Sequence, residues 1–164
     1  ALGICTAPMS IDDDIAVLEQ VPMLRALGRG ALRLIALGAE TRDVKTNEVL
    51  FRPGERIDGA YVVQEGRFQL ISDPDQPGTG APIQVGPGAM LGAFEIFAEA
   101  AKPLSARALV PSVVVRIPRS MFLKILEDDL GAAMRLRDYI EHRARQSIEQ
   151  LLEVRHTLDP NERQ

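Results

Sequence analysis

The sequence is poor in the residues that build metal sites and covalent catalytic centres. Cys5 is the single cysteine among 164 residues, so neither an intramolecular disulfide nor a thiolate metal cluster can form. The only two histidines, His142 and His156, both lie in one C-terminal segment. Neither a metal site inside a barrel nor a Ser/His/Asp arrangement can be assembled from them. We therefore expect no metal cofactor and no enzymatic activity.

The chain also lacks an excess of basic residues and long apolar runs. Its 19 Lys and Arg stand against 23 Asp and Glu, a formal net charge of −4. This balance disfavours nucleic-acid binding, because affinity for phosphate backbones comes from concentrated positive charge. No run approaches the roughly 18 apolar residues that a membrane span needs, and the opening ALGICTAP is a poor secretory signal. We expect a cytoplasmic protein without a nucleic-acid or membrane partner.

The length suits one domain with a helical appendage. Met9 and Ser10 have the character of a natural start, so we expect residues 1–9 to be disordered or foreign to the native protein. The remaining residues, 10–164, are predicted to form a single domain.

Two helices are predicted before the middle of the chain. Apolar residues recur at helical spacing over about 11–20, with Ser10 as the cap and Pro22 as the stop. A second helix is expected over about 29–38, where Gly38 provides the end.

From Thr41 onward the pattern is typical of an antiparallel sandwich or barrel, because short apolar runs alternate with Gly, Pro and Asn. Gly54 and Gly66 occupy turns that require a positive φ, which Asn47 also tolerates. The predicted fold class is α+β, mainly β, with an antiparallel β-roll or jelly-roll-like double-stranded barrel over about 41–117. Strands are predicted at 49–51, 60–63, 68–71, 82–85, 106–110 and 113–117.

The stretch from Met90 to Arg107 interrupts the strands and contains the candidate binding site. Its glycines and short apolar run predict a brief helix whose first backbone amides belong to Gly92, Ala93 and Phe94. Unpaired amides and the positive end of a helix dipole attract anions.

The C-terminal part is predicted to be helical over about 120–158. Ser120 is expected to cap a first helix, and Asp128 and Asp129 to mark a boundary before a long helix over about 130–158. Apolar residues of this long helix recur at heptad spacing, which favours pairing with a second copy. The predicted interface residues of this homodimer are Ala133, Ile140, Ala144, Leu151 and Val154.

Three segments together resemble the cyclic-nucleotide-binding domain family, which occurs in catabolite-activator-type regulators, kinase regulatory subunits and gated channels. They are NEVLFRPGERIDGAYVVQEGRFQL from Asn47, VGPGAMLGAFEIF from Val85 and KPLSARALVPSVVVRI from Lys102. The resemblance covers roughly Val21 to Arg155. It implies a β-roll that binds cyclic AMP or cyclic GMP, in a chain that stands alone and has a degenerate phosphate-binding segment.

The family segment reads roughly Phe-Gly-Glu, an apolar run, then Pro-Arg-(Ser/Ala)-Ala. The resemblance places Gly92 at the family glycine, Ala93 at the glutamate that binds the ribose hydroxyl, and Leu104 at the arginine that binds the cyclic phosphate. Ala93 has no acceptor and Leu104 has no donor. Losing both anchors would cost roughly 4 kcal/mol, which would turn a micromolar ligand into a nearly millimolar one. The implied ligand positions are Leu91, Gly92, Ala93, Phe94, Lys102, Leu104, Ser105 and Ala106.

Replacement charges near this segment are open to two interpretations each. Lys102 is either an anion ligand from the side or a solvated loop lysine. Ser105 is either a donor to the same anion or a half-exposed strand residue, and Arg107 either replaces the lost charge or forms a surface ion pair.

Two functions follow as expectations. The first is a non-catalytic sensor or regulatory module that binds a cyclic nucleotide weakly, or another small phosphate compound, and signals through its helical ends. The second is a degenerate domain that has lost its ligand and serves as a protein-interaction or dimerisation module with an unidentified protein partner or a second copy.

Overall fold

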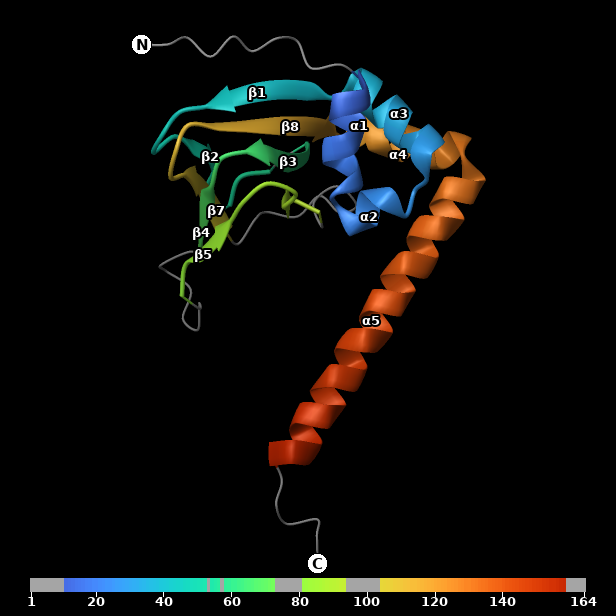
Figure 1. Cartoon of the computed structure of the whole chain (residues 1–164). Helices are drawn as coiled ribbons and strands as arrows, with labels where there is room; N and C mark the ends of the chain where they lie inside the picture. Colours follow the sequence, from blue (N-terminus) through green and yellow to red (C-terminus); the bar gives the residue numbers. More distant parts are fainter. Residues whose placement is uncertain (1–10, 53, 57, 73–80, 94–103, 159–164) are drawn as a thin grey trace, which may run out of the picture.

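The computed structural model describes residues 11–52, 54–56, 58–72, 81–93 and 104–158, the side chains of residues 72 and 154–158 excepted. Helices lie at both ends of this chain and strands lie between them (Figure 1). The elements are α1 (Ile11–Glu19), α2 (Pro22–Arg25), α3 (Arg29–Gly38), β1 (Glu40–Val44), β2 (Val49–Phe51), β3 (Gly59–Glu65), β4 (Phe68–Ser72), β5 (Ile83–Val85), β6 (Met90–Leu91), β7 (Leu104–Ala108), β8 (Ser112–Pro118), α4 (Arg119–Asp128) and α5 (Leu130–Leu158).

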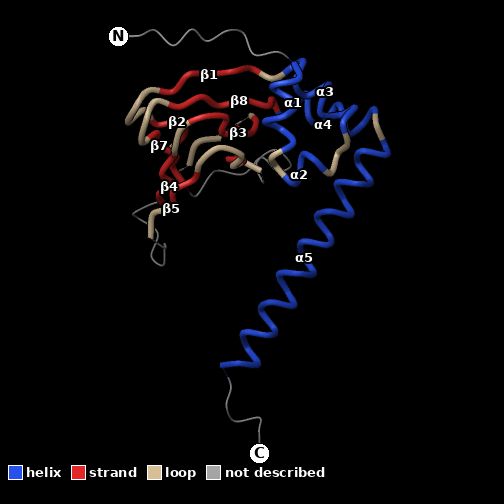
Figure 2. The backbone as a smooth tube through the Cα atoms, in the orientation of Figure 1, coloured by secondary structure: helices blue, strands red, loops and turns tan. Residues whose placement is uncertain are grey.

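The strands form two four-stranded antiparallel sheets. One sheet has the order β1-β8-β3-β6 and the other the order β2-β7-β4-β5, so neighbours in space are mostly distant in sequence. Within each sheet, every described strand pairing is antiparallel. The helices gather at one side of the strands (Figure 2). This arrangement confirms the predicted α+β class with a jelly-roll-like β-roll.

The central strand β3 of the first sheet is buried on both faces over most of its length, and the alternation of its side chains shows how. Ala60 and Val62 pack into a cluster shared with the helices, whereas Tyr61 and Val63 pack into the space between the two sheets. Because side chains of a strand alternate between faces, an unbroken apolar run suits this position. We call the two clusters the helical core and the roll core. The roll core consists of Val44, Leu50, Phe51, Tyr61, Val63, Phe68, Leu91, Ala106, Ala108 and Val114.

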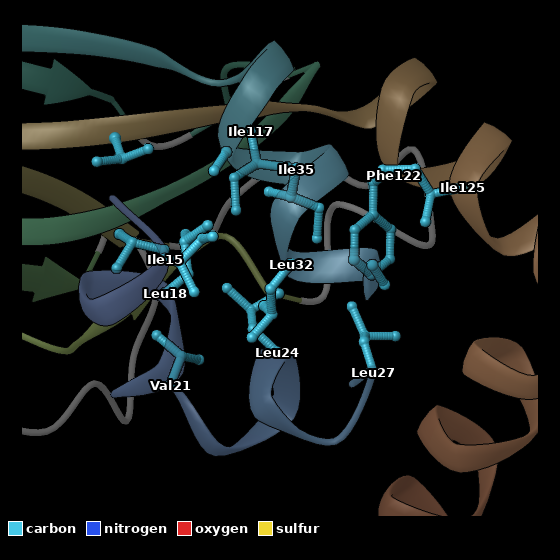
Figure 3. Close-up of a cluster of buried hydrophobic side chains, with 14 of the residues drawn as sticks. Ile15, Leu18, Val21, Leu24, Leu27, Leu32, Ile35, Ile117, Phe122 and Ile125 are labelled. Carbon is cyan, nitrogen blue, oxygen red and sulfur yellow. The ribbon is translucent and has the colours of Figure 1, made fainter. Parts of the chain in front are cut away.

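The helical core joins α1 to α4 to the outer face of the first sheet. Leu18, Leu24 and Phe122 are fully buried, and Ile117 contributes from β8. Figure 3 shows Leu18, Leu24, Phe122 and Ile117 converging on one cluster. Each fully buried large apolar side chain stabilises the fold by about 1.5–3 kcal/mol, so this cluster anchors the helices to the sheet.

The last helix, α5, packs against the body only at its start. Ala132 and Leu136 are buried there, and the Asp129 Oδ1 atom accepts a hydrogen bond of 3.0 Å from the Ala132 N–H, which caps the helix. The Arg135 guanidinium donates two hydrogen bonds, of 3.3 and 2.7 Å, to the Leu27 carbonyl. From Ile140 to residue 153 every side chain is exposed, and the helix projects away from the sheets (Figure 1).

Several predicted elements need correction. Pro22 does end the first helix, but it also begins the short helix α2, which the pattern did not reveal. Ser120 is not a cap, because α4 already begins at Arg119 with Pro118 in the capping position. The strand predicted at 106–110 runs from Leu104 to Ala108 instead. The predicted cap at Ser10 lies outside the described residues.

Other predictions are confirmed. The helices at 11–20 and 29–38, the boundary at Asp128 and Asp129, and the long helix after it are all present. The positive φ angles expected at Gly54, Gly66 and Asn47 are 83°, 97° and 67°. Within the described part of the chain, no helix is both long enough and apolar enough to span a membrane.

Candidate functional site

The first half of the candidate site begins at β6. Leu91 pairs with Tyr61 of β3 and is buried in the roll core. Gly92 follows with a φ of 88°, and Ala93 lies in a turn with its side chain half-buried. The helix predicted from here, and with it Phe94, lies outside the described residues. Gly92 and Ala93 are thus the last described residues of the first half of the site.

The second half begins at β7, where alternation separates the predicted ligand positions. Ala106 is buried in the roll core, so Leu104, two residues before it, lies on the same inner face of the strand. Ser105 lies on the opposite face, and its hydroxyl donates a hydrogen bond of 3.3 Å to the Ile71 carbonyl. An apolar side chain therefore occupies the inner position that resemblance assigns to an arginine. Lys102 lies outside the described residues.

Arg107 shares the outer face with Ser105 and does not supply a charge to the roll core. Its Nη2 atom donates a hydrogen bond of 3.1 Å to the Gln69 Oε1 atom on the neighbouring strand. Its Nε atom is buried without a hydrogen-bond partner in the described part of the chain. Of the two interpretations, neither a replacement anchor nor a surface ion pair matches this geometry, since the partner is a neutral amide.

The side chains that pack together inside the roll are apolar. Phe51 and Tyr61 stack with ring centroids 6.4 Å apart and an interplanar angle of 25°. No residue of the roll core carries a charge. Arg116, which pairs with Tyr61, lies on the same face of β8 as Val114 and is half-buried. Its Nη1 atom is 3.8 Å from the Glu40 Oε2 atom, so this cation already has a carboxylate beside it.

In the part of the chain that the structure describes, two carboxyl groups have shifted pKa values, and neither belongs to the roll core. Burial, together with the neighbouring Asp13 charge, raises the pKa of Asp14. The backbone amide of Lys45 and the side chain of Arg42 lower the pKa of Glu48. Among the described residues, no three His, Cys, Asp or Glu side chains are grouped as metal ligands would be.

The predicted interface positions on α5 differ in exposure. Ala133 is half-buried near the start of the helix, whereas Ala144 is exposed. Ile140 and Leu151 are 44% and 69% exposed. The side chain of Val154 lies outside the described residues. Because no element in the described part of the chain covers this exposed apolar stripe, the stripe can contact a partner.

The sequence analysis missed a groove between α5 and the rest of the molecule. Its volume is about 590 Å³. One feature of the sequence could have drawn attention to this region. Arg143 is the only arginine within Leu130–Leu158 that has no Asp or Glu three or four positions away. We call it the helix-side groove, and it is lined by Val21, Pro22, Met23, Gly88, Met90, Ala93, Tyr139, Ile140, Arg143, Ala144 and Ser147.

Comparisons with known proteins agree with this geometry. Residues 41–129 match the family model described as the cyclic nucleotide-binding domain. A solved cyclic nucleotide-binding-like protein from Brucella abortus is 38% identical, with a TM-score of 0.60, over 71% of this chain and 99% of that one. The sensor domain of the transcriptional regulator DNR from Pseudomonas aeruginosa is 17% identical, with a TM-score of 0.69, over 85% and 93% of the two chains. At that identity the likeness shows the fold alone.

Curated relatives are much longer than this chain. An uncharacterized NTE family protein of Mycobacterium tuberculosis is 32% identical over 115 residues, which are 70% of this chain and 19% of the relative. Lysophospholipase nte1 of Neurospora crassa is 26% identical over 135 residues, or 82% of this chain and 9% of the relative. The chain thus spans less than a fifth of the length of these proteins.

Proposed function

The chain belongs to the cyclic nucleotide-binding domain family, and from this premise we propose that it is a non-catalytic regulatory module whose output element is α5. The observation that carries the proposal is the exposed apolar stripe of α5 beyond Ile140, which no described part of the chain covers. A helix that begins in the body and then projects from it can relay a change in the body to a partner. In the relatives named lysophospholipase, the region that matches this chain is a small fraction of the protein's length. This supports a regulatory role for the matched region.

The input would be a cyclic nucleotide, or another small phosphate compound, bound weakly at the mouth of the roll. The positive φ of Gly92 and its place after β6 support this location. The apolar Leu104 and Ala93 support low affinity, because charged hydrogen bonds of about 1.5–3 kcal/mol each would be missing. We expect the dissociation constant to be close to millimolar.

Restoring one anchor tests this input directly. Calorimetric titration with cyclic AMP and cyclic GMP should show tighter binding by Leu104→Arg than by the parent, by about 10- to 150-fold. Leu104→Gln is the matched control, because it adds a polar group of similar length without charge. If Leu104→Arg binds neither nucleotide although it folds, the roll mouth is not a nucleotide site.

A second candidate function is a pairing module that has lost its ligand. The inner position of Leu104, where the family has an arginine, and the apolar roll core beside it favour this function. In this case a second copy would cover the stripe that includes Ile140, Ala144 and Leu151.

Sedimentation tests the pairing. The parent should sediment as a dimer and Leu151→Asp as a monomer, since a buried unpaired carboxylate is costly. Gln150→Asp is the matched control, because it adds the same charge about 100° around the helix from Leu151 and should leave the dimer intact. A monomeric parent would contradict the pairing.

A further inference from the structure

We propose that the helix-side groove binds a small amphipathic anion, whose apolar body lies against the methionines and whose acidic group pairs with Arg143. The site shares Ala93 with the cyclic-nucleotide position of the proposed function, but its Met90 and Arg143 side chains lie outside the roll. It also differs from the pairing function, which requires a second copy on the same helix.

The register of β6 separates the groove from the roll interior. Leu91 points into the roll core, whereas Met90, the residue before it, packs with Met23 against the helical core. Because successive side chains of a strand point to opposite faces, Met90 lines a space outside the roll. A ligand in the groove would therefore lie across the sheet from any ligand inside the roll.

The walls of the groove have the composition of a small-molecule site. Val21, Pro22 and Met23 form one wall, Met90 contributes from β6, and Ile140 lies on α5. Ligand pockets commonly measure about 300–1,000 Å³ and combine apolar walls with a few polar groups, and the groove falls inside this range. Methionine side chains adapt to irregular apolar shapes, so two of them suit a flexible chain.

The charge of Arg143 selects the sign of the ligand. At three and four positions from Arg143 the helix presents Tyr139, Ile140, Gln146 and Ser147, none of which is acidic. Within the described residues, its guanidinium forms no ion pair. Arg145, by contrast, has a glutamate four positions away on either side. A carboxylate or phosphate in the groove would supply the partner that the helix itself does not.

Two hydroxyl groups complete the polar end of the groove. Tyr139 and Ser147 flank Arg143 one helical turn away on either side and also line the groove. The Ser147 hydroxyl donates to the Arg143 carbonyl at 3.0 Å, so it can only accept further bonds. The Tyr139 hydroxyl, together with the guanidinium, can donate to an anion. Polar groups on α5 thus face apolar walls on α2 and β6, which matches a molecule with one acidic end.

Titration calorimetry on the full chain tests the proposal with four probes that share a twelve-carbon chain. Dodecanoate and dodecyl phosphate, below their micelle concentrations, should bind saturably at one site per chain. Dodecyltrimethylammonium and dodecanol should bind at least about tenfold more weakly. The two anionic probes distinguish a carboxylate ligand from a phosphate monoester. Equal binding of the cationic and anionic probes would overturn the proposal.

Variants locate the site. Arg143→Gln should weaken binding of the anionic probes by at least about tenfold, whereas Arg145→Gln, two residues away, should leave it unchanged. Ala144→Trp should abolish binding by filling the groove, with circular dichroism to verify folding. Leu104→Arg should not alter dodecanoate binding, which keeps this result separate from the cyclic-nucleotide test. An unchanged affinity in Arg143→Gln would refute the assignment.

The competing occupant is the α5 helix of a second copy, because Ile140 and Ala144 belong both to the groove and to the apolar stripe. Sedimentation with and without dodecanoate, on the parent and on Leu151→Asp, decides between them. Binding by both proteins supports the proposal. Binding by the Leu151→Asp monomer alone would overturn it, since the groove of the native protein would then belong to the second copy.

Discussion

Replacing Gly66 with alanine should destabilise the β-roll far more than the same change at Gly54. Gly66 lies in the turn between β3 and β4 with a φ of 97°. A Cβ atom built there would contact the Ser112 side chain and lie 2.7 Å from the Ser112 Cα atom. Gly54 has a similar φ of 83°, but a Cβ atom there would meet nothing within 4 Å. Both variants should show the cost of backbone strain, whereas only Gly66→Ala should also show the cost of steric overlap.

Ser112 cannot move aside cheaply. It is 3% exposed and is the first residue of β8, which pairs with both β1 and β3. Its hydroxyl accepts a hydrogen bond of 3.2 Å from the Arg67 N–H and donates one of 2.8 Å to the Val110 carbonyl. Relieving the overlap would break these bonds or shift the strand.

The magnitude follows from two contributions. A left-handed backbone conformation costs a residue other than glycine about 1–2 kcal/mol, which both variants incur. Overpacking costs about 1–3 kcal/mol more, which only Gly66→Ala incurs. We expect Gly66→Ala to lose about 2–5 kcal/mol of the free energy of unfolding, and Gly54→Ala to lose about 1–2 kcal/mol.

Urea denaturation followed by circular dichroism measures both values on purified protein. The midpoints should differ while the slopes remain the same, because the surface exposed on unfolding is unchanged. Equal losses at the two positions would refute the argument, since they would mean that Ser112 yields to the new methyl group without cost.

Three further changes test the capping, buried-polar and titration arguments. Ser112→Ala should lower the free energy of unfolding by about 1–3 kcal/mol in urea denaturation, because it leaves two backbone groups without their partner; a loss below about 0.5 kcal/mol would contradict this. Asp129→Ala should cost about 1 kcal/mol and reduce the helical circular dichroism signal on heating, since the Ala132 N–H loses its cap; an unchanged melt would contradict the cap. Folding raises the pKa of Asp14 above its ordinary value. The contribution of Asp14 to the free energy of unfolding is therefore fully present below the ordinary pKa, and it is lost as the pH rises through the pKa of the folded state. Asp14→Asn should therefore melt higher than the parent above that pH range, and parallel melting curves of the two proteins across pH would refute it.

The sequence predicted the fold well where one local signal decided the structure. Gly54 and Gly66 marked their turns because few other residues adopt a positive φ, and the long apolar periodicity marked α5. The sequence pattern failed to predict a structure that tertiary contacts determine. Pro22 suits both the end of one helix and the first turn of the next, and only the packing of Leu24 into the helical core selects the second outcome.

The candidate site was less predictable because it depends on strand faces. From the sequence alone, Ser105 is a candidate hydrogen-bond donor to a ligand. Whether its side chain points into the roll depends on the register of its strand. β7 begins at Leu104, so Ser105 lies within the strand, and the burial of Ala106 in the roll core places Ser105 on the outer face. A shift of one residue would exchange the two faces, which a pattern of five residues cannot resolve.

The groove escaped prediction for a related reason, and the same strand register explains it. Met90 and Leu91 form a two-residue strand in which each apolar side chain serves a different core. In the sequence they look like one apolar pair, and nothing in their order distinguishes the helix-side groove from the roll interior. Their separation arises from β6 pairing with the central part of β3, where Tyr61 and Val62 already point to opposite cores. The two candidate sites therefore take successive residues of β6, whose side chains lie on opposite faces of one sheet.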